Sequence, residues 1–436
     1  MEPLYLIGIS LLLSSLLLKL FLAPKSKHIS KLPPSPPSLP IIGHLHLLKK
    51  PLHHSLSQLS ARYGPILYLR FGYRPTLVIS SPQLAEQCFT TNDVAFANRP
   101  NFPSVKEVTN NHTTIIFSKY GPLWRNLRKV ATVQDWDEAT QFRQLIEKAA
   151  ALASGSRLVD FFPWFRIVNS LLVHRELKAV VKRRNEFSQG LIDEIRKGVD
   201  AQKKKTMIGD LLGLQDREPE VYTDALIRSL NMSLLQAGTD TSSNTIEWAM
   251  SLLLNNPHAL AKAQHEIDTV VGRERLVEES DVSNLSYLRA IINETLRLHP
   301  VVPLDVPHES ATECFIDGYR VPSETTLLIN IHAIHRDPAV WKDPTEFRPE
   351  RFENGKAEGM WFLPFGMGRR KCPGEGLAIR MIALALGTMI QCFEWESIGG
   401  KEVDMTEAPG IVMAKVVRLD AMYRPRTEMV PLLVGL

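Results

Sequence analysis

One cysteine stands in a basic, glycine-rich stretch late in the chain. Cys372 lies in FGMGRRKCPG, Phe365 to Gly374, directly after two arginines and a lysine. A cysteine reacts or binds a metal as the thiolate, which nearby positive charge and a following helix N-terminus stabilise. The glycines allow a flat, bulky group to approach the backbone closely. A buried structural cysteine needs none of these features, so we predict that Cys372 is functional.

A second unusual stretch, LLQAGTDTSSNTIEWAM, lies inside a predicted long helix. Ala237 and Gly238 are small, so a planar ligand could lie close to the helix there. Asp240 and Thr241 are polar between apolar flanks. By themselves these residues are equally compatible with a turn of helix that exposes polar side chains.

Two further patterns pair charged and aromatic side chains along helices. NETLRLHP places Glu294 and Arg297 three positions apart, and GPLWRNLRKVA places Trp124 and Arg128 four positions apart. On a protein surface an ion pair at this spacing stabilises by only a few tenths of a kcal/mol. A Trp–Arg pair is commonly a surface cation–π contact. In isolation neither pattern indicates a function.

The cysteine stretch satisfies the string F-x-x-G-x-R-x-C-x-G with Phe365, Gly368, Arg370, Cys372 and Gly374. With this string the chain resembles the haem-thiolate monooxygenases, the cytochromes P450. The resemblance implies a mainly α fold with small β-sheets, an α+β arrangement. It also implies that the cysteine is the axial thiolate of haem iron and that the following backbone N–H groups hydrogen-bond the sulfur.

The same resemblance gives roles to the other motifs. AGTDT matches the family's small-Gly-x-acid-Thr pattern, which implies that Asp240 and Thr241 act in oxygen activation and proton delivery. The side chains implied to reach the haem propionates are those of Trp124, Arg128, His308 and Arg370. Glu294, Arg297 and Arg351 (in FRPERF) are implied to form a buried network that locks the haem-binding region.

The resemblance covers nearly the whole chain and is strongest to the plant microsomal branch, including its isoflavonoid and flavonoid hydroxylases. It implies a monooxygenase that inserts one oxygen atom from O₂ into a small lipophilic plant metabolite. The electrons would come from NADPH through a flavoprotein reductase, with a membrane cytochrome as a second donor. Arg125, Lys129, Arg369 and Lys371 would form a basic face for such an acidic donor.

Two departures from the family pattern stand out. KVATVQ runs almost directly into DWDEATQFRQL, so several dozen residues that relatives carry near Gln134 to Asp137 are absent. A shortened chain leaves open an inactive or misfolded haem-protein isoform, and a member that rearranges or dehydrates its substrate without a reductase is a further alternative. Asp305, in VVPLDVPHES, replaces an apolar residue and either contacts a polar substrate group or points into solvent.

The N-terminus predicts a membrane anchor. Pro3 to Leu22 is nearly all apolar, about the 20 residues that span a bilayer. Glu2 precedes this run and lysines follow it, so we expect a single span over residues 1–24 in the endoplasmic reticulum, with the rest of the chain in the cytosol. A cleaved signal peptide is the alternative. A basic, proline-rich linker (25–45) and a haem-binding catalytic domain (46–436) would follow.

Composition and local patterns give the remaining expectations. The chain has 436 residues, 44% hydrophobic, with a net charge of +4, so it can bury a large core and nothing in it indicates a nucleic-acid partner. Its four cysteines match neither a secreted disulfide framework nor a CxxC zinc pattern. We expect hairpins over Ile66 to Ser80 and around Asp317-Gly318, and helices over Asp137 to Ala153, Arg175 to Val199 and Tyr222 to Asn256.

Overall fold

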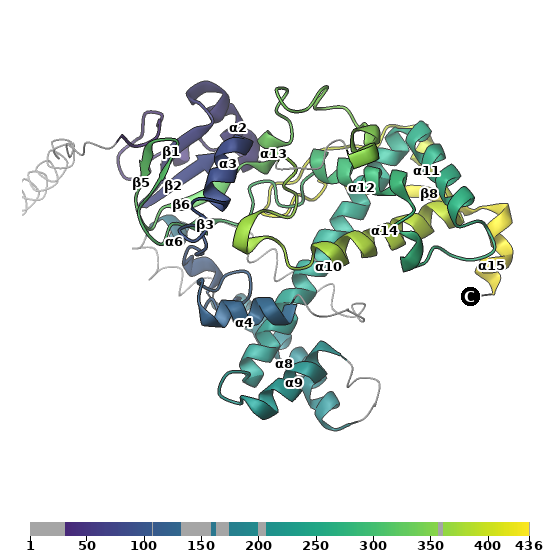
Figure 1. Ribbon diagram of the computed structural model, residues 1–436, viewed down its shortest axis with the longest axis horizontal. Helices are drawn as coiled ribbons and strands as arrows, with labels where there is room; N and C mark the ends of the chain where they lie inside the picture. Colours follow the sequence, from purple (N-terminus) through teal and green to yellow (C-terminus); the bar gives the residue numbers. More distant parts are fainter. Residues whose placement is uncertain are drawn as a thin grey trace, which may run out of the picture.

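The structure is a computed structural model that describes residues 31–106, 108–131, 158–162, 174–198, 206–355 and 361–435. Figure 1 shows a large group of helices with a small sheet set at the N-terminal side. The predicted α-rich α+β arrangement is therefore confirmed. The expected membrane anchor (1–24) and the expected helix over Asp137 to Ala153 lie outside the described residues.

Helices are the main regular structure of the described chain. The expectations for residues 175–199 and 222–256 are confirmed by α8 and α10. The long helices of the larger group are α8 (His174–Arg196), α9 (Met207–Arg217), α10 (Asp224–Asn255), α11 (Pro257–Val270), α12 (Ser286–Leu298) and α14 (Glu375–Cys392). The others are α2 (Leu52–Tyr63), α3 (Pro82–Phe89), α4 (Pro122–Ala131), α6 (Leu158–Phe161), α13 (Ile331–Ile334) and α15 (Val430–Val434).

The main sheet joins strands from both ends of the described chain, in the order β1-β2-β6-β3. Its strands are β1 (Ile66–Phe71), β2 (Arg74–Ile79), β3 (His308–Glu309) and β6 (Thr326–Ile329). β1 and β2 form the predicted hairpin, and β2 runs parallel to β6 with Leu77 opposite Leu327. The predicted turn at Asp317-Gly318 joins β4 (Cys314–Ile316) to β5 (Tyr319–Val321), and β7 (Phe393–Ser397) pairs with β8 (Ala421–Pro425).

The largest core lies among α10, α11, α12 and α14. Leu253, Ile267, Leu288 and Leu386 come from these four helices and are fully buried in one apolar cluster. At its N-terminus α10 is capped by the Thr223 hydroxyl, which accepts a hydrogen bond from Leu226 N at 3.3 Å. Because α14 belongs to this core and begins three residues after Cys372, the core fixes the position of the cysteine stretch.

One helix among the described residues, α14, is long and apolar enough to cross a membrane by length and composition. Its contacts with α10, α11 and α12 identify it as a core helix. The second half of the proline-rich segment lies against the sheet. Pro33 and Pro36 are buried, and Pro34 O accepts a hydrogen bond from Tyr68 N at 2.9 Å. From Lys31 onward the segment thus packs on the domain instead of standing away from it.

Candidate active site

The cysteine stretch folds as a tight loop that ends at α14. Cys372 N donates a hydrogen bond to Phe365 O at 2.9 Å, which closes the loop. Gly366 and Gly368 have φ values of +70° and +68°, a region that L side chains avoid. A Cβ on Gly368 would lie 2.6 Å from Asp93 Oδ1. These glycines are therefore required by the loop's own backbone and by its packing against α3.

The surroundings of Cys372 do not by themselves produce a thiolate. Burial raises the pKa of its thiol, and the opposing effects of the Gly374 N–H and the Arg128 charge are smaller. The basic neighbours are engaged elsewhere, since Arg369 pairs with Asp93 at 3.0 Å and Lys371 with Glu375 at 2.6 Å. The charges of Arg128 and Lys371 lower the pKa of Cys372, as predicted for basic neighbours, but by less than burial raises it. Coordination to a metal ion deprotonates a cysteine outright and would supply what the loop lacks.

Arg370 points from the loop into the protein. Its Nε donates to Ala97 O at 2.7 Å and its Nη2 to Ser118 O at 2.6 Å. The guanidinium also lies 4.4 Å from the ring centroid of Trp124, so the cation over this ring is Arg370 and not the Arg128 of the sequence pattern. Burial lowers the pKa of Arg370 to about 9, helped by the charges of Arg99 and Arg128.

Arg99 is a member of the site that sequence reasoning missed. It is 5% exposed, and it donates to Ile116 O at 3.1 Å and to Pro307 O at 3.0 Å. Burial lowers its pKa to about 10. Arg99 lies in the stretch FANRP, Phe96 to Pro100. Nothing in the local sequence there distinguishes an arginine that is buried in the site from one on the surface.

His308 and Asp305 form a buried pair beside this group. His308 Nδ1 lies 2.8 Å from Phe96 O, and its Nε2 lies 3.3 Å from Asp305 Oδ2. Burial alone would raise the pKa of Asp305, but the hydrogen bond and charge of His308 and the charge of Arg99 lower it. The Asp305 side chain is only 14% exposed, so the expectation that it points into solvent is wrong.

The gathered charges fit a haem. The charges of Arg99 and Arg128 act on the buried Arg370, and Arg128 Nη1 donates to Lys371 O in the cysteine loop. Asp305 is a single carboxylate beside several cations, so the group carries excess positive charge. A haem presents two propionate carboxylates and an iron that takes a thiolate ligand. Cys372 would hold the iron, and Arg370, Arg128, Arg99 and His308 surround the region that suits the propionates.

The predicted oxygen-activating residues lie in the middle of α10. Thr241 Oγ1 donates to Ala237 O at 2.6 Å, and Asn244 Nδ2 donates to Asp240 O at 2.7 Å. Gly238 is exposed although α10 is mostly buried on either side of it, at 226–233 and at 248–253, and a Cβ added to it would have no neighbour within 4 Å. Open space beside a glycine in a core helix suits a planar ligand.

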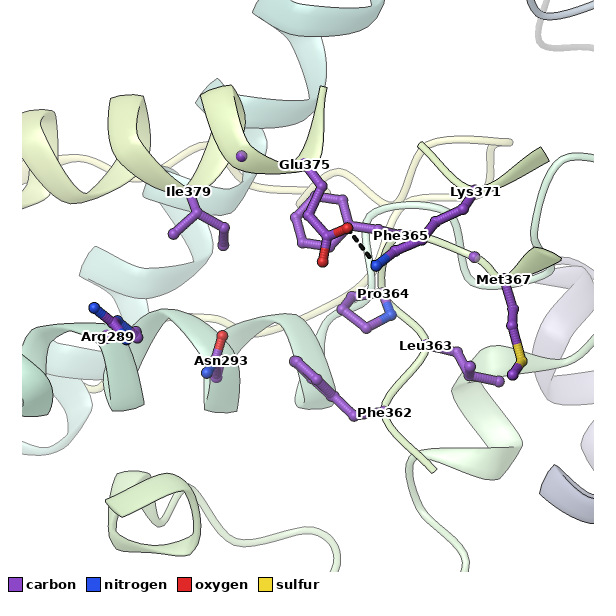
Figure 2. Close-up of a pocket in the computed structure, with 12 residues that line it drawn as sticks. Arg289, Asn293, Phe362, Leu363, Pro364, Phe365, Met367, Lys371, Glu375 and Ile379 are labelled. Carbon is purple, nitrogen blue, oxygen red and sulfur yellow. Dashed lines mark ion pairs between the residues drawn. The ribbon is translucent and has the colours of Figure 1, made fainter. Parts of the chain in front are cut away.

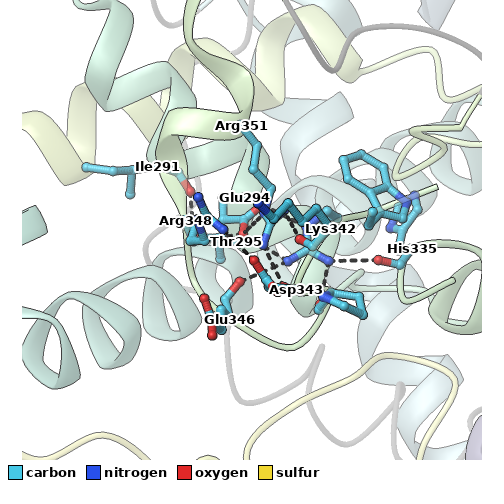
Figure 3. Close-up of polar contacts among 12 residues, drawn as sticks. Ile291, Glu294, Thr295, His335, Lys342, Asp343, Glu346, Arg348 and Arg351 are labelled. Carbon is cyan, nitrogen blue, oxygen red and sulfur yellow. Dashed lines mark hydrogen bonds and ion pairs between the residues drawn. The ribbon is translucent and has the colours of Figure 1, made fainter. Parts of the chain in front are cut away.

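The Glu294 network links α12 to the 3₁₀ helix η5 (Pro349–Gly355), as Figure 3 shows. Glu294 Oε2 lies 2.7 Å from Arg297 Nε, and Glu294 Oε1 lies 3.2 Å from Arg351 Nε. Glu294 and Arg297 are fully buried. Arg297 also donates to His335 O at 2.8 Å and to Pro344 O at 2.7 Å. The three residues are thus brought together and tie α12 to the segment that leads to the cysteine loop.

A pocket of about 750 Å³ opens on the α12 side of the cysteine loop (Figure 2). Arg289 and Asn293 line it from α12, and Phe365, Lys371 and Glu375 line it from the loop and the start of α14. Lys371 is 47% exposed and Arg369 45%, although each has an acidic partner. The expected basic face is therefore partly neutralised within the chain.

Comparison with known proteins identifies the family. A sequence model of the family Cytochrome P450 matches residues 33–135 and 132–418. The chain is 40% identical to an isoflavone 2'-hydroxylase of Glycyrrhiza echinata, covering 98% of each protein. It is 40% identical to an isoflavone 3'-hydroxylase of Medicago truncatula, over 93% of this chain and 95% of the relative. It is also 42% identical to the (+)-piperitol/(+)-sesamin synthase of Sesamum radiatum, over 91% of each.

These matches agree with the shortening inferred from the sequence. The family match is divided in two at residues 132–135, where KVATVQ meets DWDEATQ. The alignment to the Glycyrrhiza protein spans 493 positions, more than the 436 residues of this chain, so relatives carry residues with no counterpart here. With its cysteine loop, its arginine group and these relatives, the chain belongs to the cytochrome P450 family of haem-thiolate monooxygenases.

Proposed function

We propose that this chain hydroxylates a small lipophilic plant metabolite of the isoflavonoid class. Two of the relatives named above are isoflavone hydroxylases, and each matches more than nine-tenths of this chain. The observation that carries the proposal is the group of buried arginines around the Cys372 loop. That group is costly to bury unless an anionic cofactor accompanies it.

The bound haem would supply the activation of O₂ at its iron, and the chain's own residues would control binding and proton supply. Cys372 would ligate the iron, while Arg370, Arg128 and Arg99 would hold the propionates. Asp240 and Thr241, in the open middle of α10, would deliver protons through the Thr241 hydroxyl. Asn244, whose amide lies 3.5 Å from Asp240 Oδ1 and donates to the backbone Asp240 O at 2.7 Å, would position the acid.

The electrons would come from an NADPH-dependent flavoprotein reductase in the endoplasmic reticulum membrane, with residues 1–24 as the anchor and a membrane cytochrome as a second donor. The exposed part of Lys371, which lines the pocket of Figure 2, and the exposed part of Arg369 in the same loop suit an acidic docking surface. The rest of the chain would face the cytosol.

The test uses microsomes from yeast that express the full chain together with a plant reductase. After reduction and addition of CO, we expect the red-shifted Soret band of thiolate-ligated haem, and NADPH-dependent hydroxylation of an isoflavone. Cys372→Ser should abolish both. Turnover that needs no reductase would favour the rearranging alternative, and a normal band without product from any isoflavone would contradict the proposed substrate class.

A further inference from the structure

A second group of potential ligands lies apart from the cysteine loop, where three distant segments meet. His53 and His54 belong to α2, His332 belongs to α13, and Glu407 lies in the segment between β7 and β8. One nitrogen or oxygen from each of these four residues lies within 4.8 Å of those of the others. Contacts between α2 and α13, which are neighbours in Figure 1, hold the two helices together.

The side chains surround a common point. Glu407 Oε2 lies 2.8 Å from His53 Nε2 and 3.0 Å from His54 Nε2. The ring centroids are 4.4 Å apart for His53 and His54, 4.6 Å for His53 and His332, and 4.7 Å for His54 and His332. Three imidazoles at nearly equal spacing, with one carboxylate oxygen, match a tetrahedral set of ligands.

His332 is the member whose position hydrogen bonding does not explain. Its side chain is 6% exposed, and within the described part of the chain neither ring nitrogen has a hydrogen-bond partner. A neutral imidazole carries a lone pair on one ring nitrogen. A buried imidazole without a partner costs free energy. A metal ion accepting that lone pair would remove the cost.

The other oxygen of Glu407 has contacts with residues outside the group as well as with His332. Its Oε1 lies 3.5 Å from His299 Nδ1, 3.7 Å from Arg336 Nη2 and 3.9 Å from His332 Nε2. Carboxylates that bind a metal through one oxygen commonly receive such contacts on the other, which fixes their orientation.

We propose that His53, His54, His332 and Glu407 form a zinc site. Imidazole and carboxylate donors in a four-ligand set suit Zn²⁺, and a set made entirely of protein ligands is typical of a structural ion. His54 is 47% exposed and gives the ion a route of entry. The ion would fasten α2 and α13 to the segment between β7 and β8, which carries Glu407. The same segment carries Met413, whose N donates a hydrogen bond to Val301 O at 2.8 Å. The role of the ion is independent of the haem.

The experiment uses the purified full-length, haem-loaded protein, produced without a histidine tag. The protein is treated with a chelator, dialysed against ZnCl₂ and then against metal-free buffer, and its metals are counted by mass spectrometry. We expect one zinc per chain in addition to the haem iron. Zinc-edge X-ray absorption should show nitrogen and oxygen ligands at about 2.0–2.2 Å, with no sulfur.

The deciding variant is His54→Ala, because this exposed residue can be removed with little effect on folding. His258→Ala, an exposed histidine on α11, is the matched control. We expect His54→Ala and His332→Gln to bind zinc at least about 10-fold more weakly. Zinc should raise the Tm of the wild type and of His258→Ala but not that of His54→Ala.

Two results would overturn the proposal: a wild-type protein that retains no zinc, or His54→Ala with the same zinc affinity as His258→Ala. Should His332→Gln fail to fold, His54→Ala still decides. The CO difference spectrum is recorded on every sample, so a failure of haem binding is distinguished from a failure of zinc binding.

Discussion

At the scale of the residue, Asp305 is a carboxylate placed inside a group of cations. Its φ of +55° lies in the left-handed region, which aspartate adopts more readily than most residues, and its Oδ1 accepts a hydrogen bond from Val306 N at 2.7 Å. The same oxygen would lie 3.6 Å from a Cβ on Gly366 in the cysteine loop. Asp305 thus partly neutralises the charge of Arg99, which also suits a propionate.

Asp305→Asn should therefore slow the loss of haem. Asparagine tolerates the same backbone conformation and keeps an oxygen for Val306 N, so the substitution removes mainly the negative charge. A change of about 1 kcal/mol in a charge interaction corresponds to roughly 5-fold in rate. The measurement is the rate of haem transfer to apomyoglobin, with the exposed Asp420→Asn as control. Faster haem loss than in that control would show that Asp305 supports the cofactor instead.

At the scale of the element, the Glu294 network should matter for stability far more than an exposed network on the same 3₁₀ helix. Glu294→Gln leaves the fully buried Arg297 without its carboxylate, and breaking a buried pair costs about 3–5 kcal/mol. Glu353→Gln is the control, because it breaks a pair with Lys262 at 2.7 Å in which Lys262 is 45% exposed. Such a pair contributes about 0–1 kcal/mol.

Denaturant unfolding of the haem-loaded wild type and variants measures how much each substitution lowers the free energy of unfolding. A loss for Glu294→Gln no larger than that for Glu353→Gln would contradict the structural role of the network. Such a result would also mean that the hydrogen bonds from Arg297 to His335 O and Pro344 O are sufficient to hold the segment between α13 and η5 against α12.

A second contact between elements predicts sensitivity to acid. Asp268 on α11 receives two hydrogen bonds from Arg426, at 2.9 and 2.6 Å, just beyond β8. Burial opposes the charge of Asp268, but Arg426 and Arg273 outweigh it and lower its pKa. The contribution of Asp268 to stability is therefore complete above about pH 4, the pKa of an unfolded aspartate, and is lost as the pH falls through the folded pKa.

Asp268→Asn should lower the free energy of unfolding at pH 7 by about 2 kcal/mol. The difference between the wild type and the variant should shrink as the pH falls from 4 toward 2. Denaturant unfolding over that range measures it, with the exposed Asp420→Asn to correct for general acid effects. A difference that stays constant with pH would show that the charge of Asp268 is not what stabilises the contact.

At the scale of the whole molecule, sequence reasoning succeeded where the information is local. The helix predicted over Tyr222 to Asn256 is α10, and the Asp317-Gly318 turn predicts the β4–β5 hairpin. Contacts between residues that are far apart in the sequence were not predicted. Arg99 joins the site through carbonyls of residues 116 and 307, and His332 meets His53 only because α13 packs on α2. The spacing of residues along the sequence does not predict such contacts, because they depend on how the helices and loops pack.

The junction after Gln134 leads to a prediction about the whole fold. The family match is divided there, and relatives carry residues with no counterpart in this chain. The resemblance implies that the absent residues include helices packed against α10, so their loss exposes apolar surface and removes part of a slim stability margin. Inserting the corresponding segment of the Glycyrrhiza isoflavone 2'-hydroxylase after Gln134 should therefore raise both the Tm and the fraction of chains that take up haem.

The control for this insertion is a Gly/Ser segment of equal length at the same place, which relieves any strain at the junction but buries no apolar surface. The haem-to-protein ratio and the Tm are measured for both insertions and for the natural chain. If burial is the cause, only the segment from the relative improves both quantities. If the two insertions behave alike, the shortened chain has already closed its core over the junction, and stability then sets no limit on its activity.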